Sequence, residues 1–345
     1  MPLVPGKLNA FQSYNDTYRG WPVTPVRRQH PIRGSFLDPR PDPRRGAIYH
    51  EGVDIAVRDD RPERGAPRDR THRVYAIEGG VVAEATPPGQ RGHVRIGHFG
   101  YGHIDARVQA GERVRPGQMI GWTTTGSWHV HLSEFIFTTG GGRLTVNPLR
   151  RGGKVAPYVD SAPPVIHEVR FYSPANPSWG RRGKISVARL PQAGIRLRRD
   201  DLAGPVDIRV RVSDPQSFIG WFRELPHLAA PHHPFRLGLV VVSLQTGRAV
   251  LRREVFWAEQ LLDQPAGQHF APGTEQNLPA SGCQLFHATI ACDGTYWFRL
   301  VQRPYWNTTR LPNGRYRLGI RAWDTAGNRA VEKVDVTIRN RPPRL

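Results

Sequence analysis

The sequence predicts an all-β protein, and three observations support this prediction. The 345-residue chain contains 36 Gly and 32 Pro, which favour turns over long helices. Its apolar residues come in short stretches in which apolar and polar side chains alternate with the period of a strand. Turn-forming residues separate these stretches. The length suffices for two domains, and we expect an extended N-terminal wrap (1–47), an antiparallel β domain (48–150), a linker (151–164) and a β-sandwich with insertions (165–345).

The sequence up to residue 137 predicts one short strand followed by an antiparallel sheet. Residues 1–47 are rich in Pro, Arg and Gly, and IRGSF at 32–36 is the one strand expected there. A charged stretch at 58–73 contains two prolines and a glycine and is expected to be a solvent-exposed loop. The strands of the sheet are expected in GVDIAV, RVYAIEGGVVAEA, HVRIGHF, MIGWTTTG and HVHLSEFIF.

After a Pro- and Gly-containing break at 147–164, strand patterns resume. Their alternation and their turn residues are typical of an antiparallel sandwich of immunoglobulin-like or fibronectin-like character. Residues 216–302 exceed what hairpins need, so loops or insertions are expected there. Trp297 and Trp323 are expected in the core. The predicted strands are PVIHEVRFY, GPVDIRVRVSD, RLGLVVVSL, GTYWFRLVQ, GRYRLGIRAWD and AVEKVDVTI.

The net charge of +20 is spread over both halves of the chain. Such a charge attracts polyanionic surfaces, a cell wall among them. A nucleic-acid partner is unlikely from the sequence, because no basic block is interleaved with aromatic residues. No apolar run approaches the roughly 20 residues of a membrane span. The oligomeric state is left open.

Two features bear on the compartment. Cys283 and Cys292 stand nine residues apart, and either a disulfide or two buried free thiols would fit them. The segment Met1 to Ala10 lacks a charged leader followed by an apolar stretch, so no signal peptide is recognisable in this sequence.

Histidines and an aspartate form the most informative pattern. His50 and Asp54 stand four apart, whereas His129 and His131 stand two apart in a strand, which puts both on one face. Catalytic zinc commonly takes three N or O ligands, and His50, Asp54 and one of the strand histidines would supply them. A neighbouring histidine can act as acid or base, or steady an oxyanion. A helical HExxH motif is rejected because Asp54 replaces its second histidine, and Glu51 is expected to be solvated.

Each pair alone is a weak signal, but the combination resembles the lysostaphin-like, or LytM-type, zinc metallopeptidases. The resemblance covers about residues 20–148. The matching segments, in order, are IRGSFLDPR (32–40), HEGVDI (50–55), VYAIEGGVV (74–82), YGHI (101–104), GERVRPGQMIG (111–121) and HVHLSE (129–134).

By this resemblance His50, Asp54 and His131 match the zinc ligands of the family, and His103 and His129 match its catalytic histidines. The resemblance implies a zinc-dependent endopeptidase that hydrolyses peptide cross-links or stem peptides of bacterial peptidoglycan, with metal-activated water as the nucleophile. It also implies an extracellular or periplasmic location. One catalytic histidine would orient or deprotonate the water and the other would bind the oxyanion; the sequence leaves the two roles exchangeable.

Several features depart from the family pattern. The loop at 58–73 is longer than usual, the stretch at 91–103 is shorter, and Ser133 stands where Glu is more frequent, with Glu134 on the opposite face. The alternative function is therefore a catalytically quiet LytM-type protein that binds the wall or activates a hydrolase, with the long loop blocking the cleft. A polyanion binder is a third hypothesis.

The other histidines and the C-terminal domain carry no catalytic grouping. Adhesion or positioning is the expected task of the C-terminal domain. His93 and His98 are expected to be structural or exposed. No role is predicted for His167, His227, His232, His233, His269 and His287.

Overall fold

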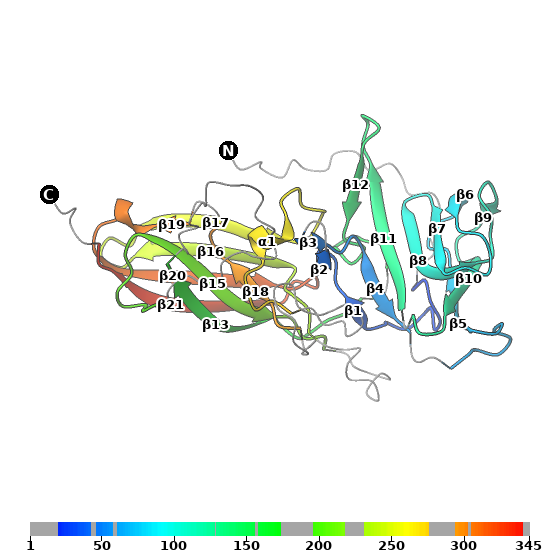
Figure 1. Cartoon of the computed structure of the whole chain (residues 1–345), viewed down its shortest axis with the longest axis horizontal. Helices are drawn as coiled ribbons and strands as arrows, with labels where there is room; N and C mark the ends of the chain where they lie inside the picture. The colour runs from blue at the N-terminus through cyan, green and yellow to red at the C-terminus, as the bar shows by residue number, and fades with distance from the viewer. Residues whose placement is uncertain are drawn as a thin grey trace, which may run out of the picture.

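The computed structural model describes residues 20–42, 46–57, 61–127, 129–155, 158–173, 196–217, 231–275, 294–302 and 305–340. Regular structure in this part of the chain is almost entirely antiparallel β-sheet, which confirms the all-β prediction (Figure 1). Below, residues 20–155 are called the N-terminal part and residues 158–340 the C-terminal part.

The N-terminal part contains one large sheet and a small hairpin. The sheet runs in the order β1-β4-β11-β8-β7-β6-β9, with β12 beside β11 and with β10 pairing both β5 and β8. The hairpin joins β2 and β3. The strands are β1 (Ile32–Gly34), β2 (Pro39–Asp42), β3 (Gly46–Tyr49), β4 (Val53–Ala56), β5 (Arg70–Tyr75), β6 (Gly80–Ala85), β7 (Gly92–Ile96), β8 (Phe99–Ala106), β9 (Arg113–Val114), β10 (Met119–Thr124), β11 (His129–Phe137) and β12 (Arg143–Val146).

The C-terminal part contains two further antiparallel sheets. One has the order β14-β13-β15-β18 with β19 beside β15, and the other has the order β17-β16-β20-β21. The elements are β13 (Val165–Tyr172), β14 (Arg196–Leu197), β15 (Pro205–Ser213), β16 (Arg236–Ser243), β17 (Ala249–Trp257), α1 (Ala266–His269), β18 (Trp297–Arg299), β19 (Trp306–Asn307), η5 (Thr308–Arg310), β20 (Gly314–Trp323) and β21 (Arg329–Ile338).

Alternating burial explains why the C-terminal strands form. In β16 every second side chain is buried, beginning with Leu237, and β20 shows the same alternation from Tyr316 to Ala322. Each strand therefore turns one apolar face to the core. Trp297 is buried as predicted, whereas Trp323 is half-buried.

The two parts share one hydrophobic core and lie side by side (Figure 1). Backbone hydrogen bonds cross the junction, because the Asn147 amide donates to the Glu259 carbonyl and the Leu261 amide to the Thr145 carbonyl, each over 2.8 Å. Helix α1 contacts strand β3. The C-terminal part is thus packed directly against the elements that carry the site described below.

Some predictions need adjustment. The charged loop is shorter than expected, because β5 already begins at Arg70 and pairs with β10, with Thr71 and His72 buried. Strand β17 was not predicted within 216–302. Glu51 is exposed, as expected. Cys283 and Cys292 lie outside the described residues, as do His227 and His287. Among the described residues no helix is long and apolar enough to cross a membrane.

Candidate metal centre

Strand register gathers the predicted site residues in the N-terminal sheet. Strand β11 lies between β4 and β8, so that His131 is paired with Asp54 on one side and with Gly102 on the other. His129 and His131 point to the same face of β11, as their spacing predicts. His50 precedes β4, and His103 follows Gly102. The fold therefore brings together all five predicted residues, His50, Asp54, His103, His129 and His131, which we call the His–Asp cluster.

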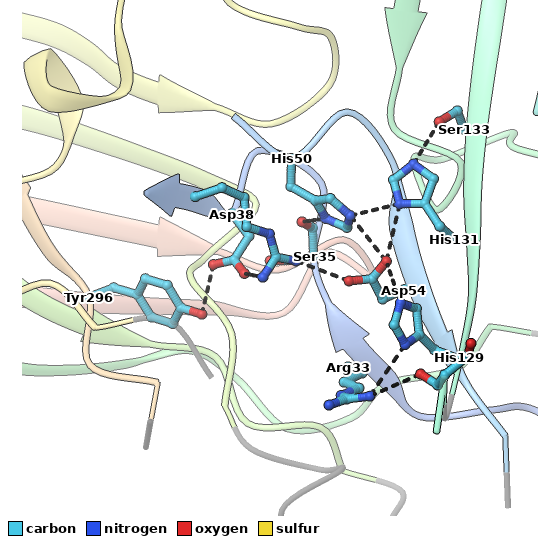
Figure 2. A network of polar contacts seen from close by, with 11 residues as sticks. Arg33, Ser35, Asp38, His50, Asp54, His129, His131, Ser133 and Tyr296 are labelled. Carbon is cyan, nitrogen blue, oxygen red and sulfur yellow. Dashed lines mark hydrogen bonds and ion pairs between the residues drawn. The ribbon is translucent and has the colours of Figure 1, made fainter. Parts of the chain in front are cut away.

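Three atoms of the cluster converge closely enough to share one cation (Figure 2). His50 Nε2 lies 2.9 Å from His131 Nδ1, and Asp54 Oδ1 lies 3.1 Å from each of these nitrogens. With metal–ligand bonds of about 2.1 Å, the edges of a tetrahedral site measure about 3.4 Å. The observed triangle is slightly smaller, so a small tetrahedral cation fits it after a minor outward shift of the rings.

The outer nitrogens of both histidine rings have partners that orient them. His50 Nδ1 lies 2.8 Å from the Ser35 carbonyl, to which it donates its proton, so the lone pair of Nε2 faces the centre. His131 Nε2 lies 2.9 Å from Ser133 Oγ. Such contacts fix the ring orientation of metal-binding histidines. Ser133, which departs from the family pattern, thus supports His131, and Glu134 pairs with the buried Arg150 instead.

The close approach of His50 and His131 tests whether a cation fits. With Nδ1 of His50 donating to Ser35, Nε2 of the neutral ring presents a lone pair to His131 Nδ1 at 2.9 Å. Two lone pairs at this distance repel each other unless a proton or a metal ion lies between them. One carboxylate oxygen and two imidazole nitrogens are a ligand set that zinc accepts. The residues present therefore fit a metal ion.

Asp54 is buried and ionised. Burial opposes ionisation, but the neighbouring His50 and His129 outweigh this effect and hold the pKa of Asp54 well below its usual range. Its second oxygen, Oδ2, accepts a hydrogen bond of 3.0 Å from Arg40 Nη2. One oxygen thus faces the histidines while the other is occupied by a guanidinium.

His103 occupies a bulge in β8. On β7 the partners of Gly102 and Ile104 are the adjacent residues His93 and Gly92, so His103 is the extra residue, and its φ is +62°. A bulge redirects a side chain, and a non-glycine residue in this conformation is strained. The His103 ring lies 4.7 Å from that of His129, centroid to centroid. The bulge therefore turns His103 toward the cluster.

His103 and His129 are neutral at neutral pH. Burial is the main cause, and it lowers the pKa of His103 to about 3 and that of His129 to about 4. A neutral imidazole offers one donor and one acceptor. Both rings can therefore take part in proton transfer or hydrogen bonding.

Arg33 distinguishes His129 from the ligands. Its Nη1 lies 3.3 Å from His129 Nδ1 and 3.2 Å from the Ser127 carbonyl. A guanidinium has donors only, so Nδ1 of His129 accepts and its ring proton resides on Nε2. That Nε2 lies 3.5 Å from Asp54 Oδ1. Asp54, His103 and His129 form a second group close enough for a cation, but a protonated Nε2 makes His129 a donor, so the first group fits the metal better.

Five residues around the cluster were not predicted as site residues. Four of them lie in the segment IRGSFLDPR, namely Arg33, Ser35, Asp38 and Arg40. The fifth, Tyr296, comes from the C-terminal part. Their signal in the sequence is weak, since arginine and serine there have no spacing of their own. Tyr296 carries no local signal.

The other histidines in the described part of the chain lie outside the cluster. His93 is exposed, and His98 contacts the buried Glu78 at 3.0 Å. Both agree with the prediction that these two histidines are structural or exposed. His232, His233 and His269 are buried in the C-terminal part.

Comparison with protein-family models and with curated proteins gives no match. The resemblance to lysostaphin-like peptidases stays a prediction from the motifs.

Proposed function

We propose that this protein is a zinc-dependent endopeptidase that hydrolyses peptide cross-links or stem peptides of bacterial peptidoglycan. The observation that carries the proposal is the His–Asp cluster, in which three ligand atoms converge beside two neutral histidines. The peptidoglycan substrate rests on the motif resemblance and is supported by the net charge of +20, which favours an anionic wall. The proposal includes a LytM-type N-terminal domain and an immunoglobulin-like C-terminal domain.

His50 Nε2, Asp54 Oδ1 and His131 Nδ1 would hold the zinc ion. When bound, zinc supplies a Lewis acid that polarises a peptide carbonyl and makes water nucleophilic at neutral pH. The side chain of His131 is 23% exposed, so this ligand reaches the protein surface, and the proposal has the peptide approach the cluster there.

The two further histidines divide the proton transfers. His103, which is neutral, accepts a proton from the attacking water and passes it to the leaving amine as the C–N bond breaks. His129 donates its Nε2 proton in a hydrogen bond to the oxyanion that forms when the C–O bond is made. The contact of Arg33 with His129 favours this division of roles over the reverse. The products are a carboxylate and a free amine.

The described part of the charged loop is held against the sheet. The Glu63 amide donates to the Thr71 carbonyl over 2.9 Å, and the Glu63 carboxylate pairs with Arg73 at 2.8 Å. The Thr125 amide donates to the Asp69 carbonyl. These contacts tie residues 63–69 to β5 and to the end of β10, so this part of the loop is anchored to the sheet.

The test is the release of new amino groups from purified peptidoglycan by the zinc-loaded protein. We expect release by the wild type and none by His103→Ala with the same zinc content. No release by the wild type despite stoichiometric zinc would contradict the proposal. That result would favour the quiet wall-binding or hydrolase-activating protein.

A further inference from the structure

A row of buried polar contacts leads from the C-terminal part to the metal-binding carboxylate (Figure 2). Tyr296 donates its hydroxyl proton to Asp38 Oδ1 over 3.0 Å. Asp38 Oδ2 lies 3.2 Å from Arg40 Nη1, and Arg40 Nη2 donates to Asp54 Oδ2 over 3.0 Å. Tyr296 and Asp38 are 258 positions apart in the sequence. The row therefore exists only because the two parts pack together.

All four side chains are shielded from water. Tyr296 and Asp38 are fully buried, and the side chains of Arg40 and Asp54 are 14% and 4% exposed. Buried charges need partners because water no longer solvates them. Asp38, which accepts the hydrogen bond of Tyr296, and Asp54 both compensate the buried guanidinium of Arg40.

The positive charge of Arg40 affects metal binding by Asp54. A guanidinium beside Asp54 repels a divalent cation, and in a buried site this repulsion is only weakly screened. Asp38 carries the opposite charge on the other side of the guanidinium and offsets it. The hydroxyl of Tyr296 in turn stabilises the ionised form of Asp38 by donating to it.

The segment that carries Asp38 also fixes His50. The His50 amide donates to the Asp38 carbonyl, and the Leu37 amide donates to the His50 carbonyl, each over 2.9 Å. The C-terminal part also contacts the adjacent β1, because the side-chain amide of Gln216 forms hydrogen bonds with both the amide and the carbonyl of Ile32. Tyr49, next to His50, contacts His269 Nδ1 at 2.5 Å.

We propose that the C-terminal part is a structural component of the metal centre, in which Tyr296, Asp38 and Arg40 are positioning residues that hold Asp54 with one oxygen turned toward the metal. The proposal rests on metal binding by the His–Asp cluster but does not require peptidase activity. A domain that merely tethers the protein to its substrate would leave metal affinity unchanged.

The test measures the zinc affinity of the full-length protein by competition with a chelator. Tyr296→Phe keeps the ring and removes the hydroxyl. Losing a direct outer partner of a metal ligand usually weakens binding about 10- to 100-fold, and because Tyr296 acts through Asp38 and Arg40 we expect its loss to weaken zinc binding about 3- to 10-fold. Asp38→Asn removes the negative charge that offsets Arg40 on the side away from Asp54 and should weaken binding further. The d–d absorption of the cobalt-substituted protein should shift in Tyr296→Phe.

Tyr316→Phe is the matched control. Tyr316 is also buried in the C-terminal part, and its hydroxyl donates to the Pro312 carbonyl over 2.8 Å. Its loss should lower thermal stability as Tyr296→Phe does, with no change in zinc affinity or in the cobalt spectrum. Equal zinc affinities for Tyr296→Phe, Tyr316→Phe and the wild type would overturn the inference, whatever the peptidase activity. Tight zinc binding without peptidase activity would contradict the proposed function alone.

Discussion

Two histidines that lie close to Asp54 are expected to respond differently to substitution. His131 Nδ1 lies 3.1 Å from Asp54 Oδ1 and 2.9 Å from His50 Nε2, so it belongs to the converging triangle. The His103 ring lies 6.0 Å from that of His131, centroid to centroid, beyond the triangle. The proposed function therefore assigns metal binding and proton transfer to different side chains.

The first prediction separates these two roles. His131→Ala should lose both bound zinc and activity, because two ligands bind the ion far more weakly than three. His103→Ala should keep zinc and fold while turnover falls by about 10²- to 10⁴-fold, the usual contribution of a general acid–base residue. Zinc content by elemental analysis and amino-group release report the two effects. A fully metallated, active His131→Ala protein would remove the assignment of this ligand.

The second prediction concerns the strained backbone at His103. Because its φ is +62°, glycine suits this position better, and a left-handed conformation costs other residues about 1–2 kcal/mol. His103→Gly should therefore raise the free energy of unfolding above that of His103→Ala by about 1 kcal/mol, while both variants are inactive. Urea unfolding of the two variants measures the difference. Identical midpoints would show that the bulge carries no strain.

At the scale of elements, the site depends on how closely β4 approaches β11. Gly52 lies between His50 and Asp54, and a Cβ atom there would come within 2.5 Å of the Leu132 carbonyl oxygen and 2.6 Å of His131 Nε2. The first contact is with backbone, so the strand itself would have to move. Glycine thus permits the register that pairs His131 with Asp54.

The third prediction follows from this contact. Gly52→Ala should separate β4 from β11 and weaken zinc binding by at least about 10-fold, in line with the sensitivity of metal sites to displaced ligands. Gly140→Ala is the control, since a Cβ atom there meets nothing within 4 Å. Competition with a chelator measures the zinc affinity of both variants. Wild-type affinity in Gly52→Ala would mean that the strands adjust without cost.

Strands with regular alternation were predictable, and strands without it were not. HVHLSEFIF and GRYRLGIRAWD correspond to β11 and β20. Strand β17 was missed because Arg252, Arg253 and Glu254 form a polar run on a strand that is largely exposed. The bulge at His103 was also beyond prediction, because it depends on the register with β7 and not on local composition.

The cluster itself was predictable because its residues stand in short motifs. Its surroundings were not, because they join segments distant in the chain. Arg40 reaches Asp54 across 14 positions, and Tyr296 reaches Asp38 across 258. Contacts of this kind follow from tertiary packing and leave no periodic pattern in the sequence.

At the scale of the whole molecule, histidines buried in both parts link stability to pH. His30 in the N-terminal part and His232 in the C-terminal part are buried, and burial lowers the pKa of each from 6.5 to about 4. The unfolded chain takes up protons below pH 6.5, whereas the native protein does so only near pH 4. Stability should therefore be retained above pH 6.5 and fall as the pH decreases toward 4.

The fourth prediction puts a size on this effect. When the pH is lowered from 7.5 to 5, each of these two histidines should reduce the free energy of unfolding by about 2 kcal/mol. The urea midpoints at the two pH values test this decrease in stability. EDTA is added to both samples so that metal release does not contribute to it. His30→Gln, which does not titrate, should show a smaller decrease. A midpoint that is the same at both pH values would contradict the prediction.

The hydrogen bonds between Gln216 and β1 have a consequence for solubility. Strand β1 stands at one end of the ten-stranded sheet, where an open edge can recruit a strand from another molecule. The Gln216 side chain accepts from the Ile32 amide over 2.7 Å and donates to the Ile32 carbonyl over 2.9 Å, as a neighbouring strand would. A single carboxamide thereby occupies the backbone groups of Ile32 and guards this edge against intermolecular strand pairing and aggregation.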